Sequence, residues 1–331
     1  MASSFRAFGD RALILGRRPR LRLALQMLAF AVLTGSLVYA VRDSWSDAEE
    51  LLRTADPLSL ALGLGAIAAY YLAFVVGWQL ILRAMGIELD YRTALRAEML
   101  SMLAKYIPGG VWTPAARVVA VRKVGVRNTP LVLGSIALEA GLSAIAGVAV
   151  FVVSLGTVSS RNAPVWPLAA FVLVLVVLLH PRVFSPLMTR IARRLGTGPI
   201  PRIRERVLLG LVGYYCLTWL LAGVALFFLA RSVGNPPVSS IPYLGGVSAV
   251  GAIVAVLVVI APSGLGVREG AMYGLLVAVM SPAAALGTVV LNRLGITVVE
   301  LVLLITIGTR RRVVLPPPDE GAEPAPDPSV A

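Results

Sequence analysis

Long apolar runs, separated by short polar segments, dominate the chain. Those that approach or exceed the roughly 20 helical residues needed to cross a bilayer core cover residues 21–41, 58–82, 131–156, 164–180, 207–230 and 284–308. Two further apolar stretches, 93–124 and 241–281, are interrupted. Because only helices and closed barrels satisfy the backbone in lipid, the pattern predicts an all-α polytopic membrane protein with six to eight transmembrane helices.

Each interrupted stretch contains a Pro-x-Gly break. The first has Pro108, Gly109 and Gly110, and the second has Pro262 and Gly264. Proline removes an amide donor and glycine loosens a helix, so the chain should reverse there. Broken backbone at membrane depth needs protein or a water-filled cavity around it. We therefore expect two re-entrant hairpins that line a polar cavity; eight full spans are the alternative.

Composition supports a membrane protein, with 58% hydrophobic residues, 14% charged residues and a mean hydropathy of +0.85. A net charge of +13 would suggest nucleic acid as the partner of a soluble protein. Here the basic residues flank apolar runs, where they set orientation and meet anionic lipid headgroups. No basic, aromatic-interleaved face is present, so we expect no nucleic-acid partner.

Charge also predicts sidedness. Basic segments at 1–20, 182–206 and 310–312 mark the cytoplasmic side, and the acid-rich loop 42–57 marks the outside. Both termini are then cytoplasmic. The first hairpin, flanked by arginines on both sides, enters from inside, and the second enters from outside. Residues 1–20 form a basic N-terminus, 21–312 a single transmembrane domain, and 313–331 a disordered tail rich in proline and acids.

This layout predicts an inverted repeat. The segments 58–82, 93–124 and 131–156 run in the opposite sense to 207–230, 241–281 and 284–308. Secondary transporters often use such a plan, with discontinuous helices meeting near the midplane.

Four acids lie in apolar or hairpin context: Glu98, Glu139, Glu269 and Glu300. A charge at a helix centre costs about 2.5–3.5 kcal/mol on insertion scales, so these acids should face the interior and be paired. The available partners are Lys105, Arg117, Arg268 and Arg293.

Depth along the last and third long spans singles out further candidates. Glu139 and Glu300 each lie about 12 Å from the cytoplasmic end by helix rise and could line one cavity. Asn292 and Arg293 fall nearer the outer third, where they could meet a headgroup phosphate.

Few residues suit other chemistry. The chain has one cysteine, Cys216, and one histidine, His180, which excludes an intramolecular disulfide and argues against a His/Cys metal site. The phosphate-binding pattern Gly-x-x-x-x-Gly-Lys-Ser/Thr is absent, so direct ATP use is not expected. We predict no cofactor and no catalytic residues.

The motif KYIPGGVW, followed by Arg117, and the later motif APSGLGVREG give the chain a family resemblance. It resembles the transmembrane region of the lysylphosphatidylglycerol synthase family over most of residues 20–312, with Ser263 where the family usually has glycine. In bifunctional members this region is thought to move aminoacylated phospholipid between leaflets. Only a short tail follows residue 312, so the resemblance implies a stand-alone member without a synthase domain.

The matching motifs imply a set of site residues. From the first motif they are Lys105, Pro108, Gly109, Gly110 and Arg117, and from the second Pro262, Gly264, Gly266, Arg268 and Glu269. The glycines would let the backbone approach a headgroup, and the arginines would hold its phosphate.

Together these observations predict a flippase-like transporter in the cell membrane that moves a phospholipid or lipid-linked sugar. Anionic phospholipids or lipid-linked glycans are its expected partners. The alternatives are a membrane-embedded glycosyltransferase and an accessory subunit of such an enzyme. A glycosyltransferase commonly needs an Asp-x-Asp pair for its metal, and the chain has none. A stoichiometric membrane enzyme partner would favour the accessory role.

Overall fold

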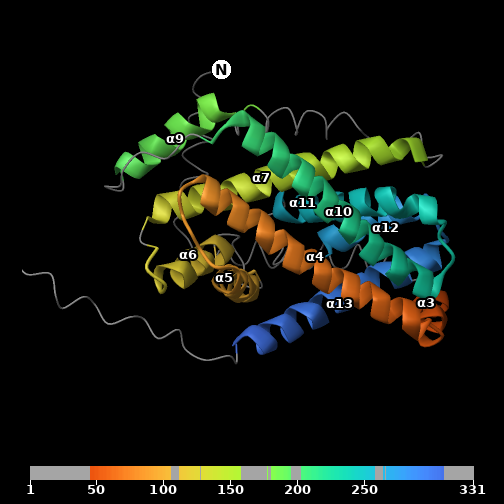
Figure 1. The fold of residues 1–331 in the computed structure, drawn as a ribbon. Helices are drawn as coiled ribbons and strands as arrows, with labels where there is room; N and C mark the ends of the chain where they lie inside the picture. Colours follow the sequence, from red (N-terminus) through yellow and green to blue (C-terminus); the bar gives the residue numbers. More distant parts are fainter. Residues whose placement is uncertain are drawn as a thin grey trace, which may run out of the picture.

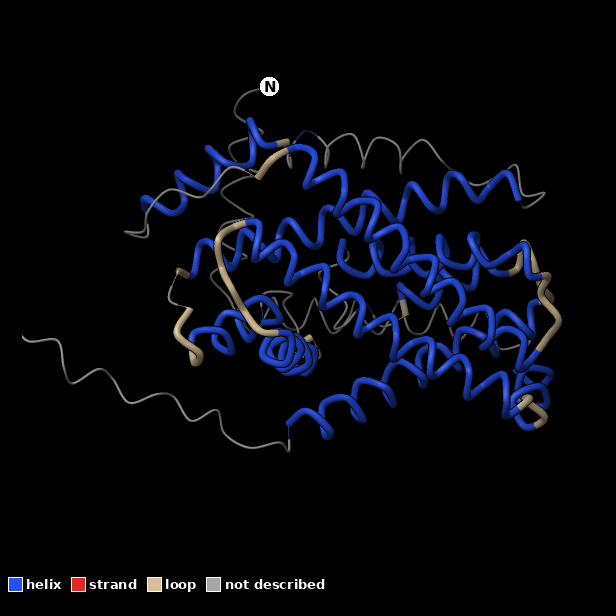
Figure 2. The backbone as a smooth tube through the Cα atoms, viewed as in Figure 1, coloured by secondary structure: helices blue, strands red, loops and turns tan. Residues whose placement is uncertain are grey.

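The computed structural model describes residues 45–105, 112–126, 128–157, 177, 180–194, 203–257, 264 and 266–308. Within them the regular structure is helical (Figure 2). The α-helices are α3 (Trp45–Arg53), α4 (Pro57–Ala84), α5 (Tyr91–Ala104), α6 (Trp112–Arg122), α7 (Thr129–Ser154), α9 (Pro181–Arg194), α10 (Glu205–Val233), α11 (Ile241–Leu257), α12 (Val267–Leu276) and α13 (Pro282–Gly308). Two short 3₁₀ turns, η2 (Leu155–Thr157) and η3 (Val238–Ser240), flank α7 and α11.

Five helical segments in the described part of the chain are long and apolar enough to cross a membrane: α4, α7, α10, α13 and η3 with α11. The sequence predicted four of them within a few residues, at 58–82, 131–156, 207–230 and 284–308. The fifth was predicted as the first arm of a hairpin. The prediction of an all-α polytopic membrane protein is confirmed. The expected span at 21–41, nearly all of that at 164–180 and both terminal segments lie outside the described residues.

Helix starts follow ordinary capping chemistry. The carboxylate of Asp56 accepts hydrogen bonds from the backbone amides of Ser59 at 2.9 Å and Leu58 at 3.4 Å, and Pro57 opens α4. Asn128 caps α7 by accepting from the amide of Leu131 at 3.2 Å. These caps place the ends of both helices just outside their apolar runs.

The long helices cross one bundle in both directions, with α4, α11 and α13 running one way and α7 and α10 the other (Figure 1). At one end, the Asp56 amide donates to the Ser232 carbonyl at 2.9 Å, which joins the start of α4 to the end of α10. At the other, Arg96 donates to the Ile307 carbonyl at 3.1 Å and joins α5 to the end of α13. This arrangement groups the loops that the charge pattern assigns to the same side.

The helix packing has a twofold pattern. Each helix from α3 to α7 can be matched, in chain order, with one helix from α9 to α13, so that α3 corresponds to α9 and α7 corresponds to α13. Two helices that pack together in the described structure then correspond to two others that also pack together. For example, α4 packs on α13 as α10 packs on α7, α5 on α13 as α11 on α7, and α3 on α13 as α9 on α7. Because α4 corresponds to α10, the packed pair of α4 and α10 corresponds to itself. This correspondence supports the inverted repeat predicted from charge signs.

The arms of each interrupted stretch pack against each other, α5 on α6 and α11 on α12. Helices α5, α6 and α12 have only 14, 11 and 10 residues, about 15–21 Å at 1.5 Å per residue. At the second turn, Gly264 and Gly266 have φ of 64° and 80°, which favours glycine. Pro108, Gly109, Gly110 and Pro262 lie outside the described residues. The chain therefore reverses twice, and re-entry into the membrane stays a prediction.

Candidate functional site

Eight charged side chains gather where the two hairpin regions meet the long helices. They are Glu98, Lys105, Arg117, Glu139, Arg268, Glu269, Arg293 and Glu300, and we refer to them as the charge network. They come from α5, α6, α7, α12 and α13, with Lys105 directly after α5. Their sequence separations are large, so only the tertiary fold brings them together.

The most buried part is a triad in which Arg117 of α6 pairs with two carboxylates. Its guanidinium contacts Glu98 of α5 and donates to Glu139 of α7. The three residues are 4%, 1% and 3% exposed. Buried ions are tolerated when they are paired. Arg117 is thus held by two acids.

An aromatic ring supports this triad. The guanidinium carbon of Arg117 lies 4.5 Å from the centre of the Trp78 ring in α4, a cation–π distance. The Trp78 indole donates to the Ser135 hydroxyl of α7 at 3.0 Å, which fixes the ring. Trp78 therefore ties three helices to the triad.

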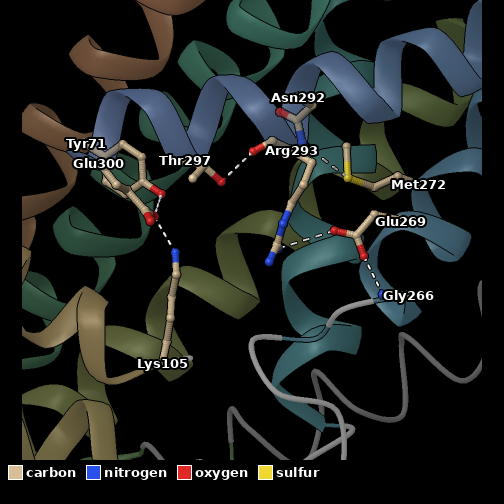
Figure 3. A network of polar contacts seen from close by, with 9 residues as sticks. All are labelled: Tyr71, Lys105, Gly266, Glu269, Met272, Asn292, Arg293, Thr297 and Glu300. Carbon is tan, nitrogen blue, oxygen red and sulfur yellow. Dashed lines mark hydrogen bonds and ion pairs between the residues drawn. The ribbon is translucent and has the colours of Figure 1, made fainter. Parts of the chain in front are cut away.

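A second cluster centres on Glu300 of α13 (Figure 3). Lys105 and the Tyr71 hydroxyl both donate to the same carboxylate oxygen, Oε1. The Glu300 side chain is 9% exposed and that of Lys105 is 20% exposed. Lys105 therefore keeps some access to its surroundings while it neutralises a buried acid.

A third cluster joins α12 to α13. Arg293 lies 3.4 Å from Oε1 of Glu269, and Oε2 of Glu269 accepts from the Gly266 amide at 2.8 Å (Figure 3). Glu269 thus neutralises Arg293 and also caps α12. Both side chains are only partly buried, at 19% and 13% exposed.

Arg268 differs from the other cations of the charge network. No described residue forms an ion pair with it, and its Nε atom is buried without a hydrogen-bond partner. Its side-chain stem lies beside Gly251 of α11. A partly buried cation without an acid beside it suits an anionic ligand.

The predicted pairing of the four acids with the four cations is largely what the structure shows, with Arg268 left over. Glu139 and Glu300, expected to line one cavity, lie in different clusters. The side-chain amide of Asn292 donates to the Met272 sulfur of α12 at 3.7 Å (Figure 3). Asn292 is buried in this contact and does not extend with Arg293 toward Glu269.

Sequence reasoning missed Tyr71 and Trp78, which complete two of the clusters. Tyr71 lies mid-span in an otherwise apolar stretch, and a buried tyrosine hydroxyl needs a partner. The position of Tyr71 deep in an apolar span could therefore have identified it as a candidate. Nothing local marked Trp78, because tryptophan is also common at membrane interfaces.

Among the described residues no group of three His, Cys, Asp or Glu side chains could hold a metal ion. The acids of the charge network are separated from one another by lysine and arginine side chains. Except for Arg268, the described side chains of the charge network form ion pairs with one another.

A comparison with family models matches residues 26–304 to the lysylphosphatidylglycerol synthase transmembrane region. The chain belongs to this family. The match covers all the described helices except the last residues of α13. It confirms the resemblance given by the two Pro-x-Gly motifs. No curated protein matched the chain.

Proposed function

We propose that this family member moves a lipid with an anionic phosphate headgroup between the leaflets of the cell membrane. The observation that carries the proposal is Arg268, which has no acidic partner among the described residues and whose Nε atom is buried without a hydrogen-bond partner. A guanidinium in a partly dehydrated site binds a phosphate group well.

The neighbouring cations support the same proposal. Lys105 follows α5 of the first hairpin region, and Arg293 lies on α13 beside α12 of the second (Figure 3). Both remain about one-fifth exposed. Three cations around one headgroup would hold it while its acyl chains stay in lipid. Movement of a lipid needs no covalent step, so the proposal requires no catalytic group.

Reconstitution into liposomes with labelled phosphatidylglycerol tests the proposal. A quencher added outside should reach label from the inner leaflet, and Arg268→Ala should abolish this movement. Arg268 neutralises no carboxylate among the described residues, so the variant should unfold at nearly the wild-type temperature. The matched control is Arg83→Ala, at the exposed end of α4, which should leave movement unchanged.

Two results would count against transport. Wild-type movement that persists in Arg268→Ala would remove the phosphate-binding role. No movement with any lipid class, together with a co-purifying glycosyltransferase or a modified lipid product, would instead favour the accessory subunit or the enzyme.

A further inference from the structure

We infer that the triad of Glu98, Arg117 and Glu139 is a proton-binding site, in which the two glutamates together hold one proton. The site lies where α5 and α6 of the first hairpin region meet α7. It involves neither Arg268 nor the phosphate group that Arg268 is proposed to bind. The inference therefore goes beyond the proposed function and does not depend on it.

The charges of the triad do not balance. Arg117 always carries its positive charge, and it is the only cation that contacts the two acids in the described structure. With both glutamates ionised, one positive charge would face two negative charges. All three side chains are buried. An uncompensated buried charge is costly, and an ionisable group in such a place becomes neutral instead. One proton on the glutamate pair removes the excess charge.

The other cations of the charge network do not supply the missing positive charge. Lys105 pairs with Glu300, and Arg293 pairs with Glu269. Arg268 forms no ion pair with any described acid. The attraction between buried ions offsets the cost of burial only when they are in direct contact. The excess negative charge therefore has to be neutralised within the triad.

Two carboxylate oxygens of the triad are available for the proton. Glu98 and Glu139 each contact the guanidinium of Arg117 through Oε2. The Oε1 atom of each is buried and has no hydrogen-bond partner in the described structure. A proton on one Oε1 leaves both contacts with Arg117 in place. Because the two acids share one cation, they titrate as a pair, and the proton belongs to the pair.

These two oxygens suit a proton better than a metal cation. A hard metal ion needs about six oxygen ligands or more. Among the described residues no group of three His, Cys, Asp or Glu side chains could hold one. The Arg117 guanidinium, in contact with both acids, would also repel a second cation.

The surrounding helices bring no further partner for the pair. The helices packed on α5, α6 and α7 are α4, α9, α10, α11 and α13. Besides the triad, the titratable and charged groups on all these helices and directly after α5 are Tyr70, Tyr71, Arg83, Tyr91, Arg92, Arg96, Lys105, Arg122, Arg182, Arg190, Arg193, Arg194, Glu205, Arg206, Tyr214, Tyr215, Cys216, Arg231, Tyr243, Arg293 and Glu300. None of those whose side chains the structure describes forms an ion pair or a hydrogen bond with the two glutamates.

The proton has a consequence for stability. Glu98, Arg117 and Glu139 join α5, α6 and α7, so neutralising the triad holds the first hairpin region against α7. In the unfolded chain both glutamates are ionised at neutral pH. The folded protein then holds one proton more than the unfolded chain, and its stability must fall as the pH rises.

Infrared spectroscopy of the purified full-length protein tests the site, because the C=O stretch of a protonated carboxyl group is separate from the bands of a carboxylate. At neutral pH, we expect a protonated-carboxyl band that shifts when the side-chain carboxyl carbon of glutamate is isotopically labelled. Glu98→Gln and Glu139→Gln should each abolish it, because Arg117 then neutralises the one remaining acid. Glu49→Gln changes an exposed acid on α3 and is the matched control, which should keep the band.

Absence of the band from the wild type, or its persistence in either triad variant, would overturn the inference. Stability in detergent is the second readout. Around neutral pH, the equilibrium constant for folding of the wild type should fall by about tenfold more per pH unit than that of Glu98→Gln or Glu139→Gln. Equal pH dependence, or stabilisation of the wild type by sodium in place of the proton, would also overturn it. The wild-type band and its pH dependence decide the matter even where a variant fails to fold. Since neither readout involves lipid, failure here leaves the proposed function standing.

Discussion

At the scale of single residues, two arginines from the two family motifs have different surroundings. Arg117 contacts two buried carboxylates and an aromatic ring, whereas Arg268 has no acid beside it in the described structure. The motifs alone gave both the same expected role, that of a phosphate ligand. Their surroundings indicate a structural role for Arg117, and under the proposed function Arg268 is the residue that binds the ligand.

Replacing Arg117 by alanine should therefore destabilise the protein. Two buried carboxylates would lose their common cation, and breaking a buried ion pair typically costs about 3–5 kcal/mol. Denaturation in detergent, read by tryptophan fluorescence, measures the loss. Adding Glu98→Gln and Glu139→Gln to Arg117→Ala should recover part of it. An Arg117→Ala protein as stable as wild type would contradict this reading of the triad.

At the scale of elements, close helix crossings depend on particular glycines. A Cβ atom on Gly223 of α10 would lie 2.3 Å from the Ile241 carbonyl oxygen, and one on Gly245 of α11 would lie 2.5 Å from the Trp219 carbonyl oxygen. In both cases the obstacle is backbone, which cannot rotate away. Small residues allow such approach in membrane bundles, where no hydrophobic effect drives helices together. The α10–α11 contact therefore depends on both glycines.

Gly223→Ala and Gly245→Ala should each lower the unfolding temperature, because a methyl group would push α10 and α11 apart. Overpacking of this kind typically costs about 1–3 kcal/mol. Gly213→Ala on the same helix is the control, since nothing lies within 4 Å of its Cβ position. Alanine there should be neutral or slightly stabilising, because it forms helix better than glycine. Equal effects at positions 213 and 223 would refute the packing argument.

At the scale of the whole molecule, the two halves match in their helix contacts and run in opposite senses. The matching segments share few residues beyond Pro-x-Gly, so the symmetry resides in packing. Hairpin regions from both halves supply charges to one network, as α5 and α6 meet α7 and α13, and α12 meets α13. A site shared in this way fits a transporter that opens alternately to each side.

Single cysteines should show the sidedness. In a background with Cys216 replaced by alanine, a cysteine at Glu49 should react with an impermeant reagent from outside, and one at Arg193 only from inside. Both positions are exposed, on α3 and α9. The sequence rule behind this is that basic loops stay in the cytoplasm. Labelling of both from one side, in intact cells and in inverted vesicles, would contradict the topology.

The sequence by itself determined the membrane class, the four predicted long spans that the described residues contain and the burial of Glu98, Glu139 and Glu300, because hydropathy is a local property. Family membership also followed from two short motifs. Tertiary structure decided the pairing: Glu98 and Glu139 share Arg117, Glu300 takes Lys105, and Arg268 is left without an acid. Ion pairing at long sequence separation depends on side-chain distance and burial, which helix packing sets and no local pattern encodes.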